Sequence, residues 1–121
     1  MREHEKINYV EFPCGDFAAT KAFFGAAFGW IFTDYGADYA AFSGAGLDGG
    51  MYRAPPADDD NNAAKNGGML VVLYSGDLES TEEKIRRHGG KIVRETFSFP
   101  GGRRFHFVEP SGNEFAVWSD K

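Results

Sequence analysis

Three short stretches of the chain place side chains that can move protons or bind anions close to aromatic rings. The pairs are Tyr9 with Glu11, Arg104 with His106, and Glu114 with Trp118. Because side chains along a strand point alternately to its two faces, the members of each pair share one face if the stretch is a strand. A carboxyl group and an imidazole can exchange protons near neutral pH, and a guanidinium suits a carboxylate or an enolate-like oxygen. The residues therefore indicate anion binding or proton transfer.

Each of these residues also has a simpler structural interpretation. Glu11 could lie in water at a strand edge, and Glu114 could end in solvent at a turn. His106, which follows Phe105 in the sequence, could be a hydrogen-bonded core histidine. Arg104 could pair with one of the two glutamates inside a cavity, where an unpaired charge is costly. The tryptophans could simply add bulk to the core or to a dimer interface.

The remaining nucleophiles and bases carry weaker signals. Cys14 is the only cysteine, so no intrachain disulfide can form, which agrees with a reducing compartment. It lies just before a predicted helix, where thiols are often reactive, but a cysteine with apolar neighbours is more often a small core residue. His4, in a charged N-terminal stretch, and His88, at a helix end, are predicted to be solvent or cap residues.

The elements that must position these residues occur twice in the sequence. Cys14-Gly15-Asp16-Phe17 returns 61 residues later as Ser75-Gly76-Asp77-Leu78, each time after an apolar run and before a helix-like run. The segments that follow the helices keep the same offset, since residues 28–32 align with residues 89–93. Such a constant register is what an internal duplication leaves behind.

Within each repeat the apolar period changes in the same order. A strand is predicted first, at 7–12 and at 70–74, followed by a helix with an Asp N-cap that ends at glycine. Three further strands follow each helix: 30–35, 38–43 and 47–53 in the first half, and 91–99, 103–109 and 114–119 in the second. The sequence therefore predicts a single α+β domain, 1–121, built from two βαβββ modules, 7–53 and 69–119.

Between the modules lies a polar segment, residues 54–68, which contains two prolines, three consecutive aspartates and two asparagines. It cannot bury itself and is predicted to be an exposed linker, although a long loop could also act as a lid.

Composition excludes several partners. The 121 residues, 42% of them hydrophobic, can build one domain with a real core. No apolar run is long enough to cross a membrane, and the charged start has no signal-peptide segment, so we expect a cytoplasmic protein. A net charge of −5 argues against nucleic-acid and membrane partners.

Taken together, several motifs resemble the vicinal oxygen chelate superfamily. They are the two βαβββ modules, the strand-Gly-Asp-helix openings, the segment Ala27–Trp30 and the hairpin sequence Glu109–Asn113. This superfamily includes glyoxalase I, fosfomycin-resistance proteins, extradiol dioxygenases and bleomycin-resistance proteins. The resemblance spans residues 7–119 and implies curved mixed sheets around a cavity that is completed in a homodimer. It does not fix the function, which ranges from metal enzymes to drug-binding proteins.

The resemblance also locates the metal ligands of the metal-dependent members. In this sequence those four positions are Tyr9, Leu70, Ala116 and Gly50. A divalent ion needs several oxygen or nitrogen donors, which leucine, alanine and glycine side chains lack. The sequence therefore predicts no cofactor and no metal at the usual position, although Glu11, His106 and Glu114 could build a displaced site.

In the fosfomycin-resistance branch a tyrosine that points at the substrate corresponds to His106, which places Arg104 on the same face. The pocket wall implied by the resemblance consists of Tyr9, Glu11, Tyr74, Arg104, His106, Glu114 and Trp118.

Two functions are compatible with this wall. One is a metal-independent small-molecule-binding protein of the glyoxalase/bleomycin-resistance type, with its ligand in a cavity of a homodimer. The alternative is a glyoxalase-like lyase or isomerase that transfers a proton next to a carbonyl, with Glu11 or His106 as the catalytic base and Arg104 stabilising the oxyanion. Loss of the metal removes the usual Lewis acid and favours the binding protein.

Overall fold

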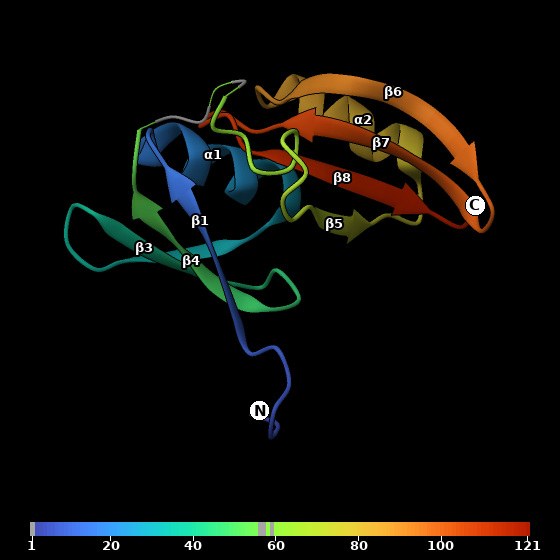
Figure 1. Ribbon diagram of the computed structural model, residues 1–121. Coiled ribbons are helices and arrows are strands. Elements are labelled where there is room, and N and C mark those ends of the chain that lie inside the picture. Colours follow the sequence, from blue (N-terminus) through green and yellow to red (C-terminus); the bar gives the residue numbers. More distant parts are fainter. Residues whose placement is uncertain (1, 56–57, 59) are drawn as a thin grey trace.

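The duplicated sequence folds into two modules with the same order of elements (Figure 1). The computed structural model describes residues 2–55, 58 and 60–121. The first module comprises β1 (Tyr9–Cys14), α1 (Phe17–Phe28), β2 (Ile31–Asp34), β3 (Tyr39–Ser43) and β4 (Asp48–Arg53). The second comprises β5 (Val71–Tyr74), α2 (Leu78–Arg87), β6 (Lys91–Phe99), β7 (Gly102–Val108) and β8 (Glu114–Ser119). The predicted α+β class with two βαβββ units is confirmed.

Each module forms its own four-stranded mixed sheet. Sheet A has the strand order β1-β4-β3-β2, and sheet B has the equivalent order β5-β8-β7-β6. In both sheets the first strand of the module pairs in parallel with the last, and the other pairs are antiparallel. The described strands form two open sheets rather than one closed barrel.

The first strand lies two residues later than predicted. The sequence placed it at residues 7–12, whereas β1 runs to Cys14 and stays in register with β4 as far as the pair Cys14–Arg53. Pro13 is tolerated within β1 because β1 is an edge strand.

Side-chain caps begin both helices, as predicted. The carboxylates of Asp16 and Asp77 each accept a hydrogen bond from the amide three residues further on, at 3.0 and 3.2 Å. α1 ends where Gly29 adopts a φ of 74°, a conformation that residues with a Cβ rarely take. α2 ends just before the predicted glycines, with His88 as its C-cap.

The main core lies between the modules, where α1 packs against residues of both sheets. The ring of Phe24 lies 5.2 Å from that of Phe115 in sheet B. Trp30 is stacked between Phe24 and Phe42, with ring centroids 4.2 and 4.7 Å apart. In Figure 1, α2 lies behind β7 and β8, so the opposite face of sheet B carries no helix. The alternate side chains of each sheet, those that point away from the helices, are therefore available to form a site.

A buried hydrogen-bond network joins the turn between β7 and β8 to the first module. Glu109 is 2% exposed, and its carboxyl group accepts from Thr20 Oγ1 at 2.7 Å and from Ser111 N at 2.9 Å. It also accepts from Asn113 N and Nδ2, at 2.9 and 2.8 Å. Asn113 Nδ2 donates in addition to Pro13 O at 2.7 Å. Burial raises the pKa of Glu109, and the four donated hydrogen bonds oppose that rise.

The segment predicted as a linker or lid is attached to the same turn. The structure describes residues 54, 55, 58 and 60–68 of it, and most of these are exposed. Asn62 is an exception at 8% exposure, and its Nδ2 donates to Gly112 O at 3.3 Å.

Candidate functional site

The seven predicted pocket residues lie on two different sheet faces. Tyr9 and Glu11 lie on the face of sheet A turned away from α1, which also carries Tyr39, Gly50 and Tyr52 and which we call open face A. The corresponding open face B, on sheet B, carries Tyr74, Arg104, His106, Glu114 and Trp118. Among the described residues, no hydrogen bond, ion pair or ring contact joins the two groups.

On open face A, three side chains form a hydrogen-bonded chain. Tyr39 OH donates to Glu11 Oε2 at 2.6 Å, and Tyr9 OH lies 2.7 Å from Tyr39 OH. Burial, together with the hydrogen bond to Glu11, raises the pKa of Tyr39. Tyr39 therefore keeps its proton and donates it to Glu11, so Tyr9 donates its own proton to Tyr39. The Tyr9 oxygen and the Glu11 carboxylate both keep acceptor capacity for a ligand. Glu11 does not lie unpaired in water.

On open face B, His106 and Glu114 form a buried pair. Their side chains are 7% and 15% exposed, and His106 Nδ1 lies 2.8 Å from Glu114 Oε2. In the tautomer whose Nδ1 donates to the Glu114 carboxylate, Nε2 is the acceptor nitrogen. Nε2 is buried and has no hydrogen-bond partner among the described residues. His106 is thus oriented by Glu114 and is not a fully satisfied core histidine.

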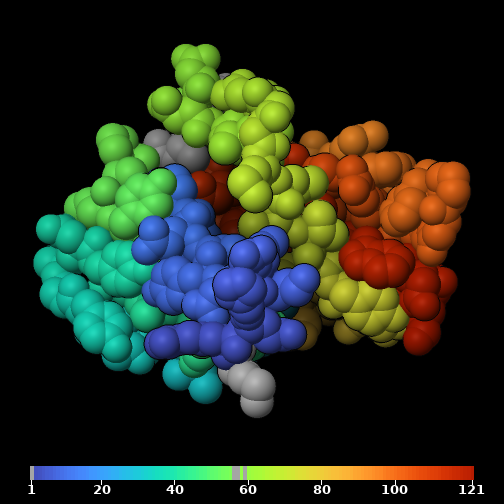
Figure 2. Space-filling model, turned by 60° about the horizontal axis from the view of Figure 1, so that its bottom comes forward, coloured from blue at the N-terminus to red at the C-terminus, as the bar shows by residue number. Residues whose placement is uncertain are grey.

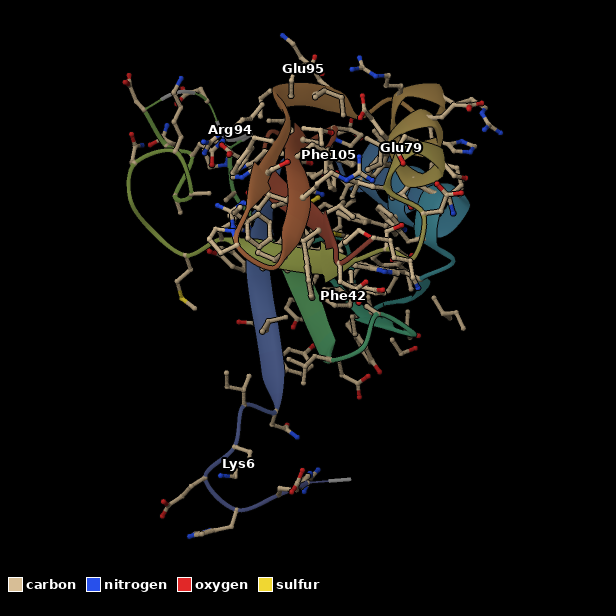
Figure 3. The ribbon with its side chains drawn as sticks, turned by 90° about the vertical axis from the view of Figure 1, so that its right-hand side faces the viewer. Lys6, Phe42, Glu79, Arg94, Glu95 and Phe105 are labelled. Atoms are coloured by element: carbon tan, nitrogen blue, oxygen red, sulfur yellow. The ribbon has the colours of Figure 1, made fainter. Side chains whose placement is uncertain are left out.

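Arg104 lies beside this pair and forms no ion pair with either candidate glutamate. Its guanidinium lies over the rings of Phe97 and Phe99, at 5.3 and 5.9 Å from their centroids. The guanidinium of Arg94, from β6, also lies over the Phe97 ring, 3.8 Å from its centroid. Arg104 Nε is buried without a partner in the described part of the chain. Figure 3 shows Arg94 on the side of sheet B opposite to Glu79 and α2.

Aromatic rings border open face B. Trp118 contacts Tyr74 and Phe99, with ring centroids 5.2 and 6.5 Å away. Tyr74 OH donates to Asp120 Oδ1 at 2.6 Å, so its ring rather than its hydroxyl is free for a ligand.

Open face A is hollowed, but only slightly. A hollow of about 170 Å³ is lined by residues that include Tyr9, Tyr35 and Asp48. Cavities that hold small molecules usually measure about 300 to 1,000 Å³, so this hollow needs a further wall to enclose a ligand.

Sequence reasoning missed three residues that belong to these faces. Tyr39 stands opposite Tyr52 across β3 and β4, and that register was not readable from the sequence. Arg94 and Phe97 lie in β6, where pairing with β7 is interrupted by two register shifts, so simple alternation does not assign their face.

The other candidates have structural roles. Cys14 is fully buried, with its Sγ 3.3 Å from Ser111 Oγ, in agreement with a core residue. His4 is exposed and lies 2.9 Å from Glu5, and His88 ends α2, as predicted.

The residues at the superfamily's metal position do not fit a metal ion. Leu70, Ala116 and Gly50 have no donor atoms. The space above Gly50 is already filled, because a Cβ built there would meet the hydroxyls of Tyr39 and Tyr9. Among residues 2–55, 58 and 60–121 there is no cluster of three or more His, Cys, Asp or Glu side chains that could hold an ion.

Comparison with known proteins agrees with this architecture. Residues 6–117 match the model of the Glyoxalase/Bleomycin resistance protein/Dioxygenase superfamily, and the chain belongs to this superfamily. No curated protein sequence matches the chain.

Solved structures extend the likeness in fold. A fosfomycin resistance protein from Listeria monocytogenes superposes with a TM-score of 0.77 at 15% identity, covering 97% of this chain and 94% of that one. A lactoylglutathione lyase from Agrobacterium tumefaciens superposes with a TM-score of 0.69 at 16% identity, covering 98% of this chain and 96% of that one. A glyoxalase/bleomycin resistance protein/dioxygenase family enzyme from Burkholderia phytofirmans superposes with a TM-score of 0.74 at 12% identity, covering 94% of this chain and 98% of that one. At such identities the likeness concerns the fold alone. Within the described residues, neither helix is long and apolar enough to cross a membrane.

Proposed function

We propose that the protein binds a small anionic molecule without a metal ion, in a cavity formed between open face B of one copy and open face A of a second copy. The proposal rests on the two buried nitrogens without partners, His106 Nε2 and Arg104 Nε. Leaving such a group without a hydrogen bond costs about 1 to 3 kcal/mol, so a ligand that supplies an acceptor for Arg104 and a donor for His106 removes that cost. The anion of a hydroxy acid has both groups, a carboxylate for Arg104 and a hydroxyl for His106.

A second copy would supply the missing wall. Open face A carries the acidic side chains of Glu11 and Asp48. Open face B carries the cationic side chains of Arg94 and Arg104, and its Glu114 is paired with His106. The two faces are thus complementary in charge. This complementarity favours a contact in which open face A of one copy packs against open face B of another. In a twofold dimer this contact occurs twice. The exposed apolar side chains on face A, such as Ile31 at 64%, also favour such coverage.

The test is calorimetric titration with the best hit of a metabolite screen against Arg104→Met and Glu11→Gln. Arg104→Met should weaken the binding of anionic ligands by about 1.5 to 3 kcal/mol, the value of a charge-assisted hydrogen bond, with the fold intact. The matched control is Arg103→Met, because Arg103 points to the other face of β7 and pairs with Glu79 at 2.6 Å. Unchanged binding in both Arg104→Met and Glu11→Gln would refute the site.

The His106–Glu114 pair also favours a second candidate function, proton transfer next to a carbonyl. An imidazole held by a carboxylate at Nδ1 and free at Nε2 is arranged as a general base, and Arg104 beside it can stabilise a developing oxyanion. Glu11 is less suited as the base because it already accepts a hydrogen bond from Tyr39.

Deuterium uptake into the bound hit distinguishes the two functions. A catalyst exchanges the proton beside the carbonyl in heavy water, and His106→Gln abolishes the exchange while Glu114→Gln slows it. If the bound molecule shows no exchange above the rate without protein, only the binding function remains.

A further inference from the structure

We infer that a groove between the two modules is a separate binding site for an amphipathic anion, specifically an aliphatic carboxylate. Two adjoining hollows, of about 310 and 160 Å³, share the residues Trp30, Ala45 and Leu73. They lie beneath the turn between β3 and β4 and along β5. We call this combined space the inter-module groove.

The groove lies mainly on the helix-bearing side of sheet B and meets open face B only along β5, through Val72 and Tyr74. Phe115 and Val117 of β8 line it, whereas Ala116 and Trp118, which alternate with them, belong to open face B. On the face shown in Figure 2, the N-terminal segment (blue) lies beside the chain that leads into β5 (yellow). Val10 and Val71 contribute to the groove from these two segments.

One part of the groove is apolar and partly exposed. Leu47, Val71 and Val72 line it and are 41%, 40% and 42% exposed. Behind them lie the buried rings of Trp30 and Phe42. An alkyl chain laid along these side chains would remove their exposed surface from water, which is the driving force for binding an apolar group.

The other part of the groove is polar and cationic. It is lined by Lys84 of α2 together with Ser75 and Thr81, whose hydroxyls lie 2.7 Å apart. The neighbouring acidic residues of α2 are engaged elsewhere, because Glu82 and Glu83 pair with Arg86 and Arg87 at 2.9 and 3.3 Å. Lys84 itself forms no ion pair and no side-chain hydrogen bond with any residue that the structure describes.

Charge complementarity therefore selects the occupant. An apolar wall that continues into a lysine and two hydroxyls matches a molecule with an alkyl chain and a carboxylate. A neutral alcohol would gain the apolar contacts but not the ion pair, and an inorganic anion would gain only the ion pair. The site has no role in the chemistry of Arg104 and His106, so it stands independently of the proposed function.

Titration of the full chain with octanoate and, separately, with octan-1-ol tests the proposal. Nitrogen-15 spectra of the labelled protein should show octanoate-induced shifts at residues 44–47 and 71–75, not at 104–106. Lys84→Met should weaken octanoate about fivefold to tenfold, the effect of losing one charged hydrogen bond at a half-exposed site, and leave octan-1-ol unchanged.

Two control variants locate the effect. Lys91→Met removes a lysine from β6, outside the groove, and should leave octanoate affinity unchanged. Arg104→Met should also leave it unchanged, so failure of this site and failure of the open-face site are separable.

Three results would overturn the proposal: no shifts at the highest soluble octanoate concentration, shifts confined to residues 9–11 and 104–106, or equal octanoate affinity in Lys84→Met and the wild type. The first of these is what a second copy occupying the groove would produce.

Discussion

Replacing Glu109 by glutamine should loosen the connection between the two modules. The Glu109 carboxyl group accepts four hydrogen bonds, two on each oxygen, from Thr20, Ser111 and Asn113. Glutamine keeps one acceptor oxygen and turns an NH₂ group toward the donors that used the other. Two hydrogen bonds are therefore lost in a buried position, which should cost about 2 to 4 kcal/mol, a large part of a typical stability of about 5 to 15 kcal/mol.

Urea unfolding followed by circular dichroism measures this cost. With a slope of about 2 kcal/mol per molar urea, the middle of the usual range, the midpoint of Glu109→Gln should fall by about 1 to 2 M. Protein concentration must be held fixed, because association with a second copy would shift the apparent stability.

The matched control is Glu95→Gln, at a side chain that is 79% exposed and lies 3.6 Å from Arg86. It should change the free energy of unfolding by less than about 0.5 kcal/mol. If Glu109→Gln lowers the midpoint no more than Glu95→Gln does, the network does not hold the modules together.

Four further outcomes are expected. Tyr39 should keep its proton above the usual tyrosine value of about 10, because its pKa is raised. Its contribution to stability should be complete below about 10 and should be lost progressively as the pH rises from there through the raised value, and ultraviolet titration of Tyr39→Phe should lack the late transition. Gly50→Ala should displace the hydroxyls of Tyr9 and Tyr39 and weaken ligand binding about tenfold, whereas Gly25→Ala, where the new Cβ makes only an ordinary contact, should not. Elemental analysis of protein purified without chelator should find no stoichiometric metal, and one equivalent that is lost in His106→Ala would prove a displaced site. Sedimentation should give twice the 13.3 kDa of one chain at micromolar concentration, and a monomer would contradict the proposed cavity.

The sequence was sufficient to predict the elements because they depend on local patterns. The repeated Gly-Asp motifs marked both helix starts, and strand alternation correctly placed Tyr9 with Glu11 and Arg104 with His106 on common faces. These are periodicities that side-chain geometry imposes over a few residues.

What the sequence could not give was the arrangement of the faces relative to one another. α1 packs on both sheets through Phe24 and its neighbours, and Glu11 and Arg104 lie on the open faces of different sheets. The bond from Tyr39 to Glu11 depends on the pairing of β3 with β4, and the position of Phe97 depends on the irregular stretch of β6. Such features arise from tertiary packing and register, which local patterns do not encode.

The two tryptophans occupy such different surroundings that they report different events. Trp30 is 8% exposed and stacked between phenylalanine rings in the core, so its fluorescence follows unfolding. Trp118 is half-buried on open face B beside Tyr74, where a bound molecule would change its environment. Trp118→Phe would therefore leave Trp30, which reports on the core and on the inter-module groove that it lines, and Trp30→Phe would leave a probe of occupancy of open face B. In the absence of a groove ligand, the two variants follow unfolding and open-face binding separately, without an added dye.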